Sequence, residues 1–249
     1  MMPAPPLPLP GREVHAWFLR LDRSIHPDVL TYLWTLLDED ERARHSGFRA
    51  ERHRREFLLS HALLRLTLSR YGPVRAQDWV FHRGEHGRPE VPGQAGPKLR
   101  FNLSHTDGMA LCAVAMDIDV GVDVEEYAQR SAPTDVVDQC FTAEEVADLN
   151  RLSGPRQRRR FFEYWTLKEA YVKARGVGLS LPLTRFAFRL APPHAPRISF
   201  EQPSDDTPES WQFVQLAPSH RHLAAVAIRR PAHSPVTVRC SEYRLVGER

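Results

Sequence analysis

The sequence predicts an α/β (α+β) protein, a pseudo-dimer of two similar α/β halves that each pack a small sheet against a long helix. The first observation behind this prediction concerns two helical patterns. R-R-E-F at 54–57 opens one and R-R-R-F at 158–161 opens the other, and each runs the same distance to a terminating glycine, Gly72 or Gly176. A recurrence of this kind indicates a repeated structural unit.

The second observation concerns two strand patterns with similar surroundings. Ser104-His105 precedes a strand that ends A-V-A at 113–115, and Ser219-His220 precedes one that ends A-V-A at 225–227. Together with the helices, these strands favour two halves of one plan. Chance similarity between amphipathic segments is the alternative explanation.

Apolar periodicity places the elements in order along the chain. Helical spacing covers 27–37, 57–68, 143–149 and 161–174. Strand alternation covers 14–21, 79–82, 99–103, 109–115, 120–124, 186–190, 211–216 and 223–228. Turn residues predict a loop at 84–97 and a polar turn at 104–108. The expected organisation is a flexible Pro-rich tail at 1–12, an N-terminal half at 13–116 and a C-terminal half at 117–249.

The composition is that of a globular protein without a strong net field. Of the 249 residues, 42% are hydrophobic and 26% charged, and 34 Lys and Arg against 31 Asp and Glu leave a net charge of +3. So small a charge favours neither nucleic acid nor an anionic membrane as a partner. The three cysteines are widely separated, which favours neither a disulfide framework nor a zinc site. We expect a cytoplasmic monomer whose two halves form one site at their junction.

The segment G-V-D-V-E at 121–125 places two carboxylates two residues apart between valines. In a strand, Asp123 and Glu125 face the same way, while the valines face the core. Like charges on one face repel unless a cation lies between them, and oxygen ligands suit Mg²⁺. A solvated edge strand is the alternative interpretation.

The second long helix carries another acidic and basic pair, Glu169 and Lys173, one turn apart on the same face. An ordinary surface ion pair would explain this spacing. A third carboxylate brought against Asp123 and Glu125 would instead complete an oxygen-rich site, and a lysine beside it would suit a phosphate.

Further polar residues are candidates for ligand contacts. Ser104 and His105 follow a strand at the start of a turn, although His105 could simply bond the local backbone. A Ser104–His105 catalytic pair is disfavoured, because adjacent strand side chains point apart and no glycine elbow surrounds the serine. The arginine-rich run at 42–55 could clamp a multiply phosphorylated ligand or could be a solvated helix face, and Arg88 is a further candidate.

Three motifs in this order and spacing resemble the phosphopantetheinyl transferase superfamily. They are F-N-L-S-H at 101–105, G-V-D-V-E at 121–125 and W-T-L-K-E-A-Y-V-K at 165–173. The H-G-R-P turn at 86–89 and G-V-G-L-S-L-P-L at 176–183 are also similar to family features. The class it most resembles is the larger, two-half Sfp-like type that activates peptide and polyketide synthetases.

This resemblance implies an enzyme, a 4′-phosphopantetheinyl transferase (holo-carrier-protein synthase). It would move the phosphopantetheine arm of coenzyme A to a serine of an acyl or peptidyl carrier protein and release adenosine 3′,5′-bisphosphate. Asp123, Glu125 and Glu169 would hold Mg²⁺, or Mn²⁺, with the pyrophosphate. Glu169 is also the candidate for taking the serine proton, directly or through a water, while Lys173 would contact the phosphate.

The resemblance implies nucleotide contacts as well. Ser104 and His105 would contact the phosphates, and Arg88 would lie near the adenosine. Family members commonly place a cation near the start of the first long helix, where this chain has Glu56 and His61. The adjacent Arg54 and Arg55 are therefore the candidates for binding the 3′-phosphate.

Two other functions use some of the same residues. A Mg²⁺-dependent phosphoesterase would use the three carboxylates to activate water, but it would need further ligands for a second metal. A non-catalytic module would bind a carrier protein or nucleic acid through its arginines and would not need the three carboxylates. Carrier domains are generally small and acidic, so we expect the partner surface at 141–160, which contains both arginines and apolar residues.

Overall fold

The structure is a computed structural model that describes residues 6–84, 88–92, 98–128, 136–191, 193–201, 204–230 and 234–245. The helices are α1 (Pro27–Leu36), α2 (Glu39–Gly47), α3 (Glu51–Leu68), α4 (Val137–Cys140), α5 (Ala143–Asn150) and α6 (Gly154–Arg175). The strands are β1 (Glu13–Arg20), β2 (His82–Arg83), β3 (Pro89–Glu90), β4 (Leu99–Thr106), β5 (Met109–Met116), β6 (Val120–Glu126), β7 (Phe186–Arg189), β8 (Arg197–Phe200), β9 (Trp211–Ser219), β10 (His222–Arg229) and β11 (Thr237–Glu242).

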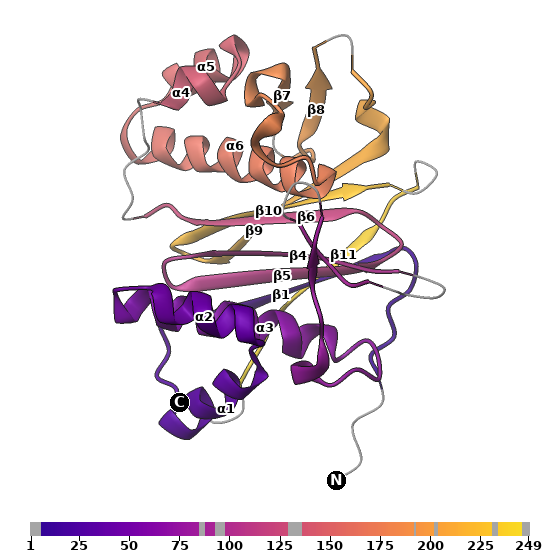
Figure 1. The fold of residues 1–249 in the computed structure, drawn as a ribbon. Coiled ribbons are helices and arrows are strands. Elements are labelled where there is room, and N and C mark those ends of the chain that lie inside the picture. The colour runs from indigo at the N-terminus through magenta and orange to yellow at the C-terminus, as the bar shows by residue number, and fades with distance from the viewer. Residues whose placement is uncertain are drawn as a thin grey trace.

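Two sheets stack face to face, and helices cover the outer face of each (Figure 1). The first sheet has the strand order β11-β1-β5-β4 and packs against α3, whereas the second has the order β6-β10-β9 and packs against α6. Each half therefore combines a small sheet with a long helix, which confirms the predicted fold class. β11 lies parallel to β1, so the C-terminal strand joins the sheet of the first half.

Three apolar cores hold these layers together. The first lies between α1, α3 and the first sheet, and the second lies between α5, α6 and the second sheet. The third, between the sheets, consists largely of valine and alanine from β5, β6 and β10. β5 and β10 are buried almost throughout because each is covered on both faces, which explains why they read as continuous apolar runs.

The structure differs from the predictions around residues 79–97. The strand predicted at 79–82 is wrong except at its last residue, because Trp79 is buried and its carbonyl accepts a hydrogen bond from Arg65 Nη1 at 2.9 Å. The short strand β2 pairs with β3, which lies inside the segment expected to be a loop. Residues 85–87 and 93–97, which include the first two residues of the H-G-R-P turn, lie outside the described residues.

Helix α2 and the end of β4 were not predicted. α2 contains almost no apolar residues, so periodicity cannot find it. Its signal is the capping box in which Asp38 and Glu41 satisfy each other's backbone N–H groups. β4 continues through Ser104 to Thr106, and the turn shrinks to Asp107 and Gly108, whose φ of 78° suits glycine.

A buried lysine fixes α6 to the elements around it. Lys168 is fully buried, and its Nζ donates to the carbonyls of Leu183 and Phe186 at 2.7 and 2.8 Å. It also lies 2.8 Å from Glu145 Oε2 on α5. Burial lowers the pKa of Lys168, while the Glu145 carboxylate opposes that effect. The helix that carries Glu169 is thereby held against α5 and against β7 with the residues just before it.

Part of the Pro-rich tail contacts the residues just after the first long helix. The Leu7 N–H donates to the carbonyl of Arg70 at 2.6 Å.

Within the part of the chain that the structure describes, every helix is too short or too polar to cross a bilayer.

Candidate active site at the junction of the two halves

The glycine of the G-V-D-V-E segment lets α6 lie directly on β6. A Cβ atom on Gly121 would fall 2.1 Å from the carbonyl oxygen of Ala170 and 2.3 Å from the backbone nitrogen of Ala174. Both atoms belong to the backbone of α6, so no side chain could turn away to make room. The close approach brings Glu169 and Lys173 to the carboxylates of β6.

Asp123 is the most enclosed of the three predicted carboxylates. It is 4% exposed, and its Oδ1 lies 2.6 Å from Lys173 Nζ. Ser104 Oγ, on β4 of the other half, donates to the same oxygen at 2.9 Å. Asp123 Oδ2 is buried and has no hydrogen-bond partner among the described residues. An unpaired carboxylate oxygen in this position is ready to accept a cation or a donor from a ligand.

Glu125 and Glu169 lie next to the Asp123 carboxylate. Trp165 Nε1 donates to Glu125 Oε1 at 3.2 Å, and Thr106 Oγ1 donates to Glu125 Oε2 at 3.4 Å. The pKa of Glu169 is raised, first by burial and then by the Asp123 carboxylate, and Lys173 offsets part of this rise. A buried carboxylate whose charge is disfavoured by a second carboxylate indicates a site that suits an added positive charge.

Comparison with known proteins matches both halves of the chain. A family model described as "4'-phosphopantetheinyl transferase superfamily" matches residues 119–227, and one described as "4'-phosphopantetheinyl transferase, N-terminal" matches residues 26–117. The chain is 33% identical to the 4'-phosphopantetheinyl transferase HetI of Nostoc sp. over 229 residues, 91% of this chain and 92% of HetI. The chain belongs to the 4'-phosphopantetheinyl transferase superfamily.

Other relatives agree with this assignment. The transferase is 26% identical to the 4'-phosphopantetheinyl transferase Sfp of Bacillus subtilis, across 83% of this chain and 89% of Sfp. It is 28% identical to the ffp enzyme of the same species, across 85% of this chain and 90% of that relative. The resemblance to the Sfp-like, two-half class that the sequence motifs indicated is confirmed.

The carboxylates of the transferase suit a divalent cation that is shared with a ligand. Among the described residues, no three His, Cys, Asp or Glu side chains gather closely enough to hold a metal by themselves. Mg²⁺ is commonly bound by one or two carboxylates plus phosphate oxygens and waters, so a complete protein cage is not required. The unpaired Asp123 Oδ2 and the raised pKa of Glu169 both fit such an ion.

A cavity of about 610 Å³ opens beside the site, on the side of the first half. Arg44, His61 and His105 line it, together with acidic residues of α2. Although His105 is exposed, the protein atoms around its ring exclude enough water to lower its pKa, and the nearby His61 and Lys173 lower it further. The cavity therefore offers a neutral imidazole and a guanidinium next to the carboxylate site.

Arg54 and Arg55 are engaged elsewhere. Arg54 donates to the carbonyls of Phe48 and Arg49, at the junction of α2 and α3. Arg55 donates to the carbonyl of Arg23 at 2.7 Å. Neither arginine lines the cavity that contains His105. Arg44 does, although sequence reasoning treated it only as part of the basic run.

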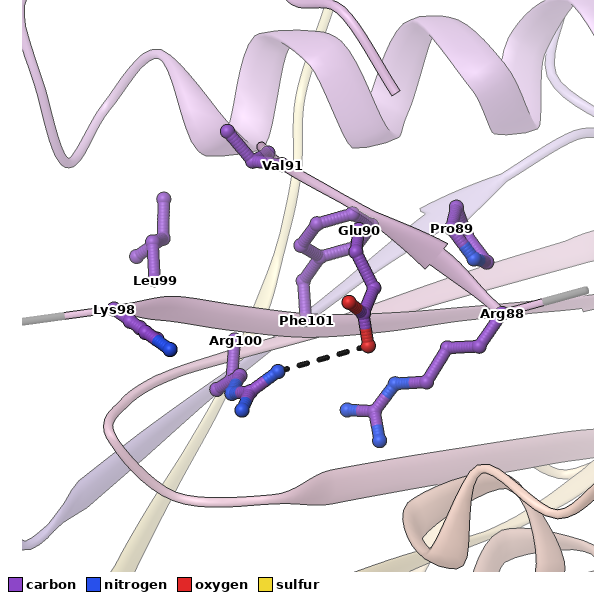
Figure 2. Close-up of a pocket in the computed structure, with 8 residues that line it drawn as sticks. All are labelled: Arg88, Pro89, Glu90, Val91, Lys98, Leu99, Arg100 and Phe101. Atoms are coloured by element: carbon purple, nitrogen blue, oxygen red, sulfur yellow. Dashed lines mark ion pairs between the residues drawn. The ribbon is translucent and has the colours of Figure 1, made fainter. Parts of the chain in front are cut away.

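Arg88 links the two halves near the end of α6. Its Nη1 donates to the carbonyl of Ala174 at 3.0 Å and lies 3.9 Å from Asp119. Arg88 lines a cavity of about 280 Å³. Figure 2 shows its side chain among the other lining residues, with the ion pair between Arg100 and Glu90. Burial is the main cause of the lowered pKa of Arg88. Arg88 thus has a packing role in addition to any contact with a ligand.

Sequence reasoning missed Trp165 and Thr106, and it did not single out Arg44 within the basic run that it proposed for phosphate binding. Arg44 could have been found from the α2 capping box, which places it on the same helix as Glu41. Trp165 stood out only as an apolar residue of α6. Thr106 gave no signal of its own, because its role depends on how β4 lies beside β6.

Proposed function

We propose that this transferase moves the 4′-phosphopantetheine arm of coenzyme A to a serine hydroxyl of an acyl or peptidyl carrier protein, with Mg²⁺ or Mn²⁺ as cofactor and adenosine 3′,5′-bisphosphate as the product released. The observation that carries this proposal is the buried, unpaired Oδ2 of Asp123, whose other oxygen pairs with Lys173 and whose charge raises the pKa of Glu169, in a chain related to named phosphopantetheinyl transferases.

The reaction would be an in-line displacement at phosphorus. The serine oxygen forms a bond to the β-phosphorus of coenzyme A as the bond to the departing bisphosphate breaks. Asp123, Glu125 and Glu169 would hold the Mg²⁺, which neutralises pyrophosphate charge and stabilises the leaving group when bound. Most of the acceleration would come from holding the reactants in place.

Glu169 and Lys173 would have complementary roles. Glu169 lies beside Asp123, so its carboxylate could take the proton of the serine hydroxyl, directly or through a water. Lys173 lies on the same face of α6 and is 28% exposed, so its ammonium can reach a phosphate oxygen from its place beside Asp123. His105 and Arg88 would contact the nucleotide.

Mass spectrometry of a carrier protein tests this function. An apo carrier protein is incubated with the transferase, coenzyme A and Mg²⁺, and the carrier is expected to gain one phosphopantetheine group. EDTA in place of Mg²⁺ should prevent the gain. Unmodified carriers across several acyl and peptidyl types would count against the proposal.

The same reactions distinguish the two rival functions. A phosphoesterase would consume coenzyme A without any carrier, whereas the transferase should leave it intact. A binding module would form a salt-sensitive complex with the carrier and leave the masses of both unchanged. Either outcome would replace the proposed function.

We propose Arg44 for the 3′-phosphate of coenzyme A, because Arg44 lines the cavity that contains His105, whereas Arg54 and Arg55, the candidates from the sequence, donate to backbone carbonyls outside that lining. Replacing Arg44 by alanine is expected to raise the KM for coenzyme A about tenfold with a smaller effect on kcat. Arg49→Ala, in the same exposed basic run, is the matched control and should leave KM unchanged. Equal KM values for the two variants would contradict the assignment to Arg44.

The raised pKa of Glu169 predicts that the stability of the protein depends on pH. Its pKa is higher in the folded protein than the ordinary value of 4.5, so its contribution to stability is greatest below that value and is lost as pH rises through the folded pKa. In EDTA at pH 7, Glu169→Gln is therefore expected to melt at a higher temperature than the wild type. The difference should shrink near pH 4, and a lower melting temperature at pH 7 would contradict this account.

The remaining expectations concern surroundings and partners. The free cysteines Cys112, Cys140 and Cys240 suit the reducing cytoplasm that we propose as the location. Both sides of the site come from one chain, which supports a monomeric enzyme.

For binding of the acidic carrier protein we propose the surface of α5 and the start of α6, where Arg151, Arg156 and Arg159 are exposed. Neither nucleic acid nor a membrane is proposed as a partner.

A further inference from the structure

Two hydroxyl groups of β4 make the same pair of hydrogen bonds to β6. Ser104 Oγ accepts the N–H of Val124 at 3.4 Å and donates to the Asp123 carboxylate at 2.9 Å. Two residues later, Thr106 Oγ1 accepts the N–H of Glu126 at 3.3 Å and donates to the Glu125 carboxylate at 3.4 Å. Each hydroxyl thus binds one backbone N–H and the carboxylate of the preceding residue.

These bonds lie where β4 and β6 meet. Side-chain oxygens of β4 accept backbone N–H groups of β6 there, as backbone carbonyls would within one sheet. β4 pairs with β5 and β6 pairs with β10, but β4 and β6 belong to different sheets. Asn102 Oδ1 accepts the N–H of Val122 at 2.8 Å, which extends the pattern one step before Ser104. Alternate residues of a strand share one face, so three acceptors at period two match three N–H groups at period two. Without these acceptors the buried N–H groups would be costly.

The hydroxyl protons are already committed. A serine or threonine hydroxyl has one proton to donate, and Ser104 and Thr106 donate theirs to Asp123 and Glu125. A fully ionised phosphate oxygen can only accept. Either hydroxyl could bind such a phosphate only by releasing its carboxylate, so their place in the junction favours a role in holding the carboxylates.

We infer that Ser104 and Thr106 are positioning residues that fix the two carboxylates of β6 for the metal. This inference rests on the proposed function, because it takes Asp123 and Glu125 as metal ligands. Thr106 is the clearer case, since Ser104 also lies 3.2 Å from Lys173 Nζ. Trp165 donates to one oxygen of Glu125 and Thr106 to the other, which sets the plane of that carboxylate. Outer partners of this kind orient metal ligands and tune metal affinity.

The test removes the Thr106 hydroxyl while keeping its shape. Binding of Mn²⁺ alone is measured by electron paramagnetic resonance, and the Mg²⁺ dependence of carrier modification is measured in parallel. Thr106→Val is expected to weaken Mn²⁺ binding about tenfold and to raise the half-saturating Mg²⁺ concentration similarly, with kcat at saturating Mg²⁺ largely kept. Thr106→Ser, which restores the donor, should return both values to those of the wild type.

The matched control is Thr67→Val. Thr67 is a fully buried threonine of α3 whose hydroxyl has no hydrogen-bond partner among the described residues, so the same chemical change should leave Mn²⁺ binding unaltered. If Thr106→Val does not fold, Thr106→Ala removes the same hydroxyl without placing a second methyl group against β6.

The outcomes separate this inference from the function on which it rests. Wild-type Mn²⁺ affinity in Thr106→Val, or no recovery in Thr106→Ser, would overturn the positioning role alone. A wild-type protein that binds no Mn²⁺ and modifies no carrier would overturn both the positioning role and the proposed function.

Discussion

Replacing Gly121 by alanine is expected to abolish carrier modification and to lower the free energy of unfolding by about 3 kcal/mol. The added methyl group would meet the backbone of Ala170 and Ala174 at 2.1 and 2.3 Å, so α6 must lift away from β6. Glu169 and Lys173 lie on that helix, and their contact with Asp123 would be lost with it. Urea denaturation and the carrier mass assay measure the two effects.

Gly72 provides the control for this substitution. A Cβ atom there would meet nothing within 4 Å, and Gly72 does not have the positive φ that disfavours other residues. Gly72→Ala should therefore change stability by about 0.5 kcal/mol or less and leave activity intact. A Gly121→Ala protein with wild-type stability and turnover would show that close helix packing does not build the site.

The second large effect is expected for Asp123→Ala, which should reduce turnover by about a thousandfold while leaving the melting temperature nearly unchanged. The substitution removes the carboxylate with the unpaired buried oxygen, and with it one of the three ligands proposed for the metal. The cost to the fold is small because Lys173 is partly exposed and its ammonium can be solvated when its partner is gone. Wild-type turnover in this variant would contradict the assignment of the site.

Asp123→Ala also has a consequence for Glu169. The Asp123 carboxylate is one cause of the raised pKa of Glu169, so its removal should lower that pKa. In EDTA, the stabilising effect of Glu169→Gln at pH 7 should accordingly be smaller in the Asp123→Ala background than in the wild type. Melting curves of the single and double variants measure this difference.

The carboxylate site could be predicted from sequence because its geometry follows from local periodicity. D-x-E on a strand and E-x-x-x-K on a helix each place two functional groups on one face, whatever the rest of the fold does. The joint presence of both motifs then required only that the helix pack on the strand. Gly121 fulfils that requirement, and the sequence already contained it beside Asp123.

The arginine assignments could not be made in the same way. An arginine side chain is long, and whether it reaches a ligand or a nearby carbonyl depends on the turn around it. Arg54 donates to a carbonyl just before α3 and Arg55 to the carbonyl of Arg23, while Arg44 lines the cavity from a helix that contains almost no apolar residues and is therefore invisible to periodicity.

Contacts between strands far apart in the sequence could not be predicted either. β11 joins β1 from the opposite end of the chain, and Thr106 meets Glu125 only because β4 and β6 lie in register across the junction. Neither relation leaves a pattern within a single segment.

The most direct test of the account is the position of a metal ion in a crystal of the transferase grown with coenzyme A and Mn²⁺. Anomalous scattering is expected to place one Mn²⁺ at the junction of the two halves, with ligand distances of about 2.2 Å to carboxylate oxygens that include Asp123 Oδ2. An ion bound away from Asp123, Glu125 and Glu169, or coenzyme A bound there without any ion, would contradict it.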